Sequence, residues 1–163
     1  MKNFPVNVNG KEYWVSRSIA TVTYVYGVFN GVPCILANKR GPGLPNKVGL
    51  WNCVSGYLDY DETLEDAAVR EVFEETGVRI DKSDLFMDGI DSSVEREYQN
   101  VLVRYYANIG TRADEVVLTD KNSEPNEVDE IKWIPLSEID NYQWVSENHK
   151  RKITTFYFKY FLA

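Results

Sequence analysis

The stretch from Gly56 to Val78 constrains this chain more than any other part of it. It reads GYLDYDETLEDAAVREVFEETGV, in which a glycine leads into a short acidic loop and then into a helix that stops at Gly77. At about 100° per residue, the side chains of Glu71, Glu74 and Glu75 fall within one sector of that helix. Carboxylates crowded onto one face repel one another unless a cation lies among them. The pattern therefore predicts a helix with an apolar flank in the core and oxygen ligands on the other flank.

Strand-like segments lie on both sides of this helix, and a second amphipathic helix closes the chain. We expect a tight hairpin at 5–15, whose second arm continues toward the next strand. Further strands are expected at 18–29, 32–37, 50–54, 85–94, 98–109 and 128–134, the helix at 63–76, a turn at 95–97, loops at 41–49 and 110–127, a short turn or helix at 135–138, and a helix from 146 onward. This order implies an α/β protein with a mixed sheet and helices on both faces.

Length and composition indicate one soluble globular domain over residues 1–163, with a hairpin-like extension at 1–15 and a C-terminal helix at 146–163. No apolar run reaches the length of about 18 residues that a membrane helix needs, and the N-terminus lacks a signal-peptide core. We therefore expect a cytoplasmic protein without a membrane partner. Cys34 and Cys53 should be reduced and buried, and His149, the single histidine, should lie at the surface.

The formal net charge of −7 argues against general binding to nucleic acid or anionic membrane, since both favour a basic surface. A nucleotide remains a suitable small-molecule substrate, because divalent cations can reverse the local sign of the charge. Carboxylates without histidine or cysteine favour Mg²⁺ or Mn²⁺ over zinc. Three glutamates alone would more often be a solvated helix face, so the spacing of the whole stretch decides the interpretation.

That spacing resembles the signature of the Nudix hydrolases at every fixed position. The matching residues are Gly56, Glu62, Arg70, Glu71, Glu74, Glu75 and Gly77, followed by the aliphatic Val78. The resemblance implies an α/β/α sandwich with a central mixed β-sheet. It also implies cleavage of a nucleoside diphosphate linked to another moiety, by attack of a metal-activated water, with Mg²⁺ or Mn²⁺ and more than one ion once substrate is bound.

The resemblance also implies roles for the matching residues. Glu74 and Glu75 look like the principal metal ligands, and Glu71 like a further ligand or the group that orients the attacking water. Arg70 would fix a catalytic glutamate, and Glu62 would join that network at the start of the helix. The residue before the signature glycine often lends a carbonyl to the metal. Here it is Ser55, where many members have glycine.

A downstream acid frequently completes such a metal site. Glu127 and Glu130 are the candidates, and Glu127 is preferred because it falls in the loop before a strand. The substrate-binding residues that we expect are Lys39, Arg40, Gly56, Tyr57 and Tyr98. The basic pair would neutralise phosphate oxygens, and an aromatic ring (Trp51, Tyr57, Tyr98, Tyr106 or Trp144) would stack on a base.

Three hypotheses for function remain open. The first is a metal-dependent hydrolase acting on a free nucleoside diphosphate derivative, as a monomer or homodimer. The second is a non-catalytic nucleotide sensor of the same family. The third is a hydrolase acting on RNA 5′ ends, which the acidic chain disfavours because binding to RNA depends on basic side chains. The residues after the signature give little information on the subfamily. Ser93 stands near the position where enzymes of the ADP-ribose type have a proline. Tyr98 stands slightly beyond the position where diadenosine polyphosphate hydrolases have a tyrosine.

Overall fold

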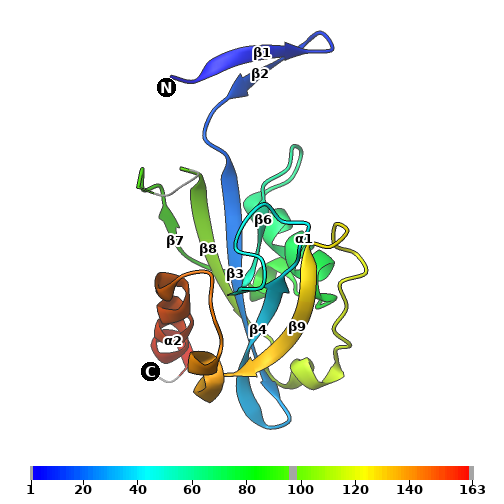
Figure 1. Cartoon of the computed structure of the whole chain (residues 1–163), viewed down its shortest axis with the longest axis vertical. Coiled ribbons are helices and arrows are strands. Elements are labelled where there is room, and N and C mark those ends of the chain that lie inside the picture. Colours follow the sequence, from blue (N-terminus) through cyan, green and yellow to red (C-terminus); the bar gives the residue numbers. More distant parts are fainter. Residues whose placement is uncertain (1, 96–98, 162–163) are drawn as a thin grey trace.

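A seven-stranded mixed sheet forms the centre of the protein, seen in a computed structural model that describes residues 2–95 and 99–161 (Figure 1). β3 pairs in parallel with β8 and in antiparallel fashion with β4 and β6, so the predicted mixed sheet is confirmed. The path is β5-β4-β3-β8-β7, with β6 paired to β3 and β9 to β4. The strands are β3 (Ile19–Phe29), β4 (Val32–Arg40), β5 (Trp51–Asn52), β6 (Val54–Tyr57), β7 (Phe86–Asp91), β8 (Val101–Asn108) and β9 (Val128–Pro135).

Two helices cover opposite faces of the sheet, which gives the predicted α/β/α arrangement (Figure 1). Successive side chains of β3 point to opposite faces. Tyr24 and Tyr26 therefore pack against Ile153 and Phe156 of α2, whereas Val25 belongs to the apolar cluster on the side of α1. The Tyr26 hydroxyl also donates to the Ile153 carbonyl at 2.6 Å. The helical segments are α1 (Leu64–Thr76), α2 (Glu147–Phe161) and the 3-10 turns η1 (Lys82–Asp84), η2 (Gly110–Glu115) and η3 (Leu136–Asn141).

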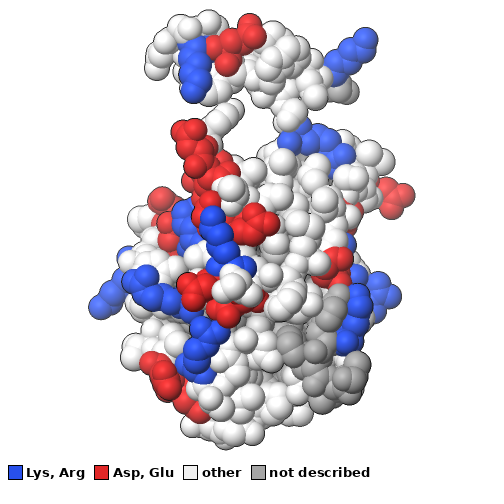
Figure 2. Space-filling view, turned by 180° about the vertical axis from the view of Figure 1, so that it is seen from behind, with Lys and Arg blue, Asp and Glu red and all other residues white. Residues whose placement is uncertain are grey.

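The N-terminal hairpin stands clear of the main sheet (Figures 1 and 2). β1 (Phe4–Val8) and β2 (Lys11–Val15) form a separate two-stranded sheet, joined by the predicted turn at Asn9 and Gly10, both of which have positive φ. The expected continuation of its second arm into the next strand was wrong, because the pairing ends at Val15 and resumes only in β3. Among its ring contacts, Tyr13 meets Tyr60 edge-on at 5.3 Å.

The strand expected at 50–54 is divided into β5 and β6. The break falls at Cys53, whose backbone N–H donates to the imidazole Nε2 of His149 at 3.0 Å. A side chain from α2 thus takes the place of a strand partner. The strand expected at 98–109 begins at Val101, and the predicted turn at 95–97 lies mostly outside the described residues.

Both cysteines, Cys34 and Cys53, are buried free thiols, as predicted. None of the helices in the described ranges is both long and apolar enough to cross a lipid bilayer.

Candidate active site

Helix α1 is fixed at both ends by signals in its own sequence. Thr63 is its N-cap: the Asp66 N–H donates to Thr63 Oγ1, and the Thr63 N–H donates to Asp66 Oδ2, each at 3.2 Å. Gly77 ends the helix in the left-handed region, with φ of 76°, and its N–H donates to the Phe73 carbonyl. The predicted helix is confirmed, with Thr63 as its cap. These caps set the position of every glutamate on the helix.

Arg70 is the centre of the polar network on this helix. Its Nε and NH2 groups bind both carboxylate oxygens of Glu62, at 3.0 and 2.8 Å. NH1 binds Glu71 at 2.7 Å and Glu74 at 3.0 Å, and NH2 also donates to the Tyr57 carbonyl. The guanidinium accordingly lowers the pKa of Glu62. One arginine thus orients three carboxylates, Glu62, Glu71 and Glu74.

Glu75 lies deeper than its neighbours and is only 4% exposed. Its Oε2 accepts a hydrogen bond from Asn38 Nδ2 at 2.5 Å and another from the Ser55 N–H at 3.4 Å. Burial raises the pKa of Glu75 well above its usual value, and the charges of Glu71 and Glu127 raise it further. Burial likewise raises the pKa of Glu71 to about 7, against the opposing effect of Arg70. The ionised forms are therefore costly unless a further cation, in addition to Arg70, lies beside them.

The absence of a side chain at Gly56 makes room for Glu71. A Cβ atom placed on Gly56 would lie 1.9 Å from Glu71 Oε1 and 2.0 Å from Cδ. Ser55, one residue earlier, lies in β6 opposite Val22 and does not adopt a positive φ. Extended backbone of this kind accommodates any residue, so the serine in place of the usual glycine leaves its carbonyl in an ordinary strand conformation.

We expect Gly56→Ala to lower activity at least about tenfold while costing less than about 1 kcal/mol of unfolding free energy. The added methyl group would displace the Glu71 carboxylate from the position in which Arg70 holds it. Steady-state hydrolysis and urea unfolding of the same preparation would measure both quantities. Gly89→Ala is a control, because Gly89, like Gly56, does not have a positive φ, and the nearest atom that its Cβ would meet is Arg104 NH2 at 3.7 Å. Equal activity of Gly56→Ala and the unaltered protein would contradict this role of the glycine.

The carboxylates suit a hard divalent cation by their chemistry. In the part of the chain that the structure describes, no three His, Cys, Asp or Glu side chains are already grouped as a metal cage. Glu71 and Glu75 are nevertheless oxygen donors with raised pKa values, and each is influenced electrostatically by Glu127. A cation beside them would offset that repulsion, and Mg²⁺ and Mn²⁺ favour such ligands. Glu130 instead pairs with Lys132 at 2.5 Å.

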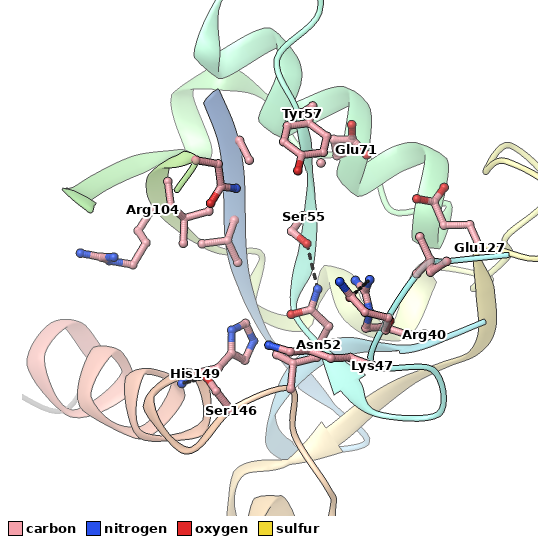
Figure 3. A pocket seen from close by; sticks show the side chains of 18 of the residues that line it. Arg40, Lys47, Asn52, Ser55, Tyr57, Glu71, Arg104, Glu127, Ser146 and His149 are labelled. Atoms are coloured by element: carbon pink, nitrogen blue, oxygen red, sulfur yellow. Dashed lines mark hydrogen bonds between the residues drawn. The ribbon is translucent and has the colours of Figure 1, made fainter. Parts of the chain in front are cut away.

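A pocket of about 850 Å³ opens between α1 and the start of α2 (Figure 3). One side, the acidic wall, is lined by Gly56, Tyr57, Arg70, Glu71, Glu74 and Glu127. The opposite side, the α2 wall, is lined by Lys47, Ser146, Asn148, His149 and Lys152. Figure 3 shows Glu71 and Tyr57 at one end of the pocket, and His149 and Ser146 at the other. Ser55 lies between them and accepts a hydrogen bond from Asn52 at 2.8 Å.

The structure separates the expected substrate-binding residues. Arg40 lines the pocket and is held there by the carbonyl of Asn46 at 3.2 Å. Lys39 does not line it and pairs with Asp129 at 2.9 Å, because adjacent residues of a strand point to opposite faces. Tyr57 lines the acidic wall and is 52% exposed, so its ring is open to a ligand.

The other expected stacking residues belong elsewhere. The rings of Trp51, Tyr106 and Trp144 are buried in the core. Tyr98 lies outside the described residues. Pocket residues that the sequence did not reveal include Lys47, Asn52, Arg104 and His149.

The expectation that His149 is a surface residue was wrong. Its Nε2 accepts the Cys53 N–H, and its ring lies 5.3 Å from the Tyr24 ring and 6.0 Å from that of Trp144. Burial, with a smaller contribution from Lys47, lowers the pKa of His149 to about 3. In the sequence near His149, the local signal for the start of α2 is Ser146, whose hydroxyl accepts the His149 N–H as a helix cap.

We expect the unaltered protein to lose about 2 kcal/mol more unfolding free energy between pH 7 and pH 5 than His149→Gln. The unfolded imidazole, with a pKa near 6.5, takes up a proton in this range, whereas the folded one stays neutral. A lowered pKa therefore costs stability as the pH falls. Urea unfolding at the two pH values measures the difference. Identical pH dependence of the two proteins would contradict the burial of this ring.

The comparison with protein families agrees with this geometry. The family model described as the NUDIX domain matches residues 19–156, which include the sheet, α1 and most of α2. The chain belongs to the Nudix family. The N-terminal hairpin lies outside the matched range, whereas the complete Nudix signature at Gly56–Val78 lies within it.

Individual Nudix relatives are similar over shorter segments. An NAD-capped RNA hydrolase of Schizosaccharomyces pombe is 45% identical over 42 residues, which is 26% of this chain and 11% of that protein. The putative mutator protein MutT4 of Mycobacterium tuberculosis is 29% identical over 96 residues, which is 55% of this chain and 34% of the relative. The chain thus spans about a tenth of the first relative and about a third of the second.

Solved structures establish the fold. The NUDIX domain of Shewanella oneidensis NrtR, in complex with ADP-ribose, superposes with a TM-score of 0.72 at 18% identity. The match covers 89% of each chain. The Nudix fold predicted from the signature is therefore confirmed, both in its mixed sheet and in the helices on its two faces.

Proposed function

We propose that this protein is a divalent-metal-dependent pyrophosphohydrolase, which cleaves the diphosphate linkage of a nucleoside diphosphate derivative. The observation that carries the proposal is the Arg70 network, which holds Glu71 and Glu74 at the wall of a pocket beside the buried Glu75. Cationic side chains, Arg40 and Lys47 among them, line the same pocket. Opposite charges on its walls suit a substrate with anionic phosphates that carries cations with it.

In this proposal Glu71, Glu74 and Glu75 hold Mg²⁺ or Mn²⁺, with the Ser55 carbonyl and Glu127 as further ligands. A bound divalent ion would lower the pKa of a water molecule and neutralise phosphate charge. Arg70 orients the carboxylates, and Asn38 holds Glu75 through its hydrogen bond.

Arg40 and Lys47 bind phosphate oxygens, and the exposed ring of Tyr57 offers a stacking surface to a base. Hydrolysis adds the oxygen of water to one phosphorus and breaks the bond from that phosphorus to the bridging oxygen. The bridging oxygen leaves with the other phosphorus, and the two hydrogens of the water are carried by the two products or released to solvent as protons.

A hydrolysis screen tests the proposal directly. The purified protein is incubated with Mg²⁺ or Mn²⁺ and with nucleoside triphosphates, ADP-ribose, NADH, nucleotide sugars and dinucleoside polyphosphates. Metal-dependent release of phosphate monoesters from at least one compound is expected. Tight binding of a nucleotide without turnover across the panel would instead favour the sensor hypothesis and would rule out the proposed activity.

Hydrolysis of RNA 5′ ends is a second candidate, because relatives named NAD-capped RNA hydrolases match the chain around its signature. On the face that Figure 2 shows, basic and acidic side chains of the described residues alternate instead of forming a basic stripe. RNA affinity that falls steeply as the salt concentration rises would favour this candidate, since it reports contacts between lysine or arginine and backbone phosphates.

A further inference from the structure

The α2 wall of the pocket consists of hydrogen-bond donors and cations. Lys47 and Lys152 both line it, and neither forms an ion pair with any residue that the structure describes. By contrast Lys150, two residues before Lys152 on the same helix, pairs with Asp140 at 2.6 Å. Lys152 lies over the ring of Phe156 at 5.4 Å, which leaves its charge without a carboxylate partner among the described residues. In a chain with a net charge of −7, two such lysines at a pocket are suited to an anionic ligand.

The orientation of His149 adds a neutral donor to this wall. A backbone N–H can only donate, so the bond from Cys53 makes Nε2 of His149 the acceptor. The neutral ring must then carry its proton on Nδ1. No described residue accepts a hydrogen bond from that Nδ1, and the ring points into the pocket (Figure 3). Contacts with Tyr24 and Trp144 hold the ring in this position.

The aromatic rings of this wall are not available to a base. Tyr24 is 2% exposed and Trp144 is 8% exposed, so neither presents an open face. The open ring, that of Tyr57, belongs to the acidic wall. A wall of donors and cations without a stacking surface matches a group that offers only anionic oxygen acceptors.

We propose that the α2 wall binds a phosphoryl group that lies beyond the diphosphate cleaved at the acidic wall. Nδ1 of His149 donates to one of its oxygens, and Lys47 and Lys152 neutralise its charge. The substrate class is thus a nucleotide with at least one phosphate outside the cleaved linkage. This assignment rests on the proposed function for the role of the acidic wall.

Because His149 is the single histidine of the chain, its ring nitrogens can be observed by NMR without ambiguity. The ¹⁵N-labelled full-length protein is titrated with inorganic phosphate, and in parallel with adenosine as an uncharged nucleoside. A neutral ring protonated on Nδ1, with resonances that shift on addition of phosphate and not of adenosine, is expected. A ring protonated on Nε2, no shift with phosphate, or an equal shift with adenosine would overturn the proposal.

Charge variants locate the phosphate. Lys47→Ala and Lys152→Ala should each weaken its effect on the His149 resonances at least about fivefold, the scale of one charge-assisted contact. Lys150→Ala removes the same charge from α2 outside the wall, and its effect should stay below about twofold. Equal effects of all three substitutions would indicate general charge screening and would overturn the proposal.

The two proposals fail separately. A protein that binds phosphate at His149 but hydrolyses none of the screened compounds retains this subsite and loses the proposed activity. If the protein hydrolyses nucleotides but its His149 resonances do not shift on addition of phosphate, the proposed activity stands and the proposed subsite is wrong.

Discussion

Replacing Glu75 by glutamine is expected to lower turnover at least about a hundredfold, the scale of losing one preorganised electrostatic contact. The amide has nearly the shape of the carboxylate, so an oxygen can still accept the hydrogen bond from Asn38. What the substitution removes is the buried negative charge. Initial rates at saturating Mg²⁺ and substrate measure the effect.

The stability of the same variant gives a second readout. The folded pKa of Glu75 is raised, so its ionised form costs stability as the pH rises above the unfolded value. Without metal, Glu75→Gln should therefore be at least as stable as the unaltered protein at pH 8. Glu65→Gln is the matched control on the same helix, where the Tyr105 hydroxyl can still donate to the amide oxygen. Unchanged Mg²⁺-dependent hydrolysis in Glu75→Gln would remove Glu75 from the site.

Arg70→Ala is expected to lower the unfolding free energy by about 2 kcal/mol, because it leaves three partly buried carboxylates without their common donor. It should also abolish measurable hydrolysis, since Glu71 and Glu74 lose their orientation. Urea unfolding gives the first quantity and initial rates the second.

A second substitution separates two effects of Arg70→Ala: the loss of attraction between the guanidinium and the carboxylates, and the repulsion that remains among the carboxylates. Adding Glu62→Gln to Arg70→Ala removes one of the uncompensated charges and should restore part of the lost stability. Arg112→Ala, which breaks a more exposed pair with Asp84, should cost less than about 1 kcal/mol. If Arg70→Ala lowers the unfolding free energy no more than Arg112→Ala does, the Arg70 network does not stabilise the fold more than an exposed ion pair.

The helix of the Nudix signature was predictable because its signals are local. Thr63, Gly77 and the spacing of the glutamates act within a few residues of one another, and the structure places them as expected. The different positions of Lys39 and Arg40 could also be predicted, because successive side chains of a strand point to opposite faces and cannot both face one pocket. The signature thus predicted the acidic wall much better than the wall opposite.

The α2 wall depends on contacts between distant segments. Nothing near His149 in the chain indicates that Cys53 will donate to it, and the position of Asn38 against Glu75 requires the whole of β4 and α1 to be in place. The hydrophilic neighbours of His149 predict a surface position, whereas α2 turns the ring of His149 toward Tyr24 and Trp144. Such tertiary pairings leave no periodic mark on the sequence.

The parallel pairing of β3 with β8 has a consequence for the order of folding. It joins Ile19 to Val101, so a long loop must close before the centre of the sheet exists. Closing such a loop costs entropy before the pairing stabilises it, which makes sheets with non-local contacts slow to fold. Helix α1 lies within that loop. Asn38 of β4 lies within the same loop, so its contact with Glu75 does not depend on this closure, whereas Glu127 lies beyond β8 and joins the site only once β9 has paired with β4.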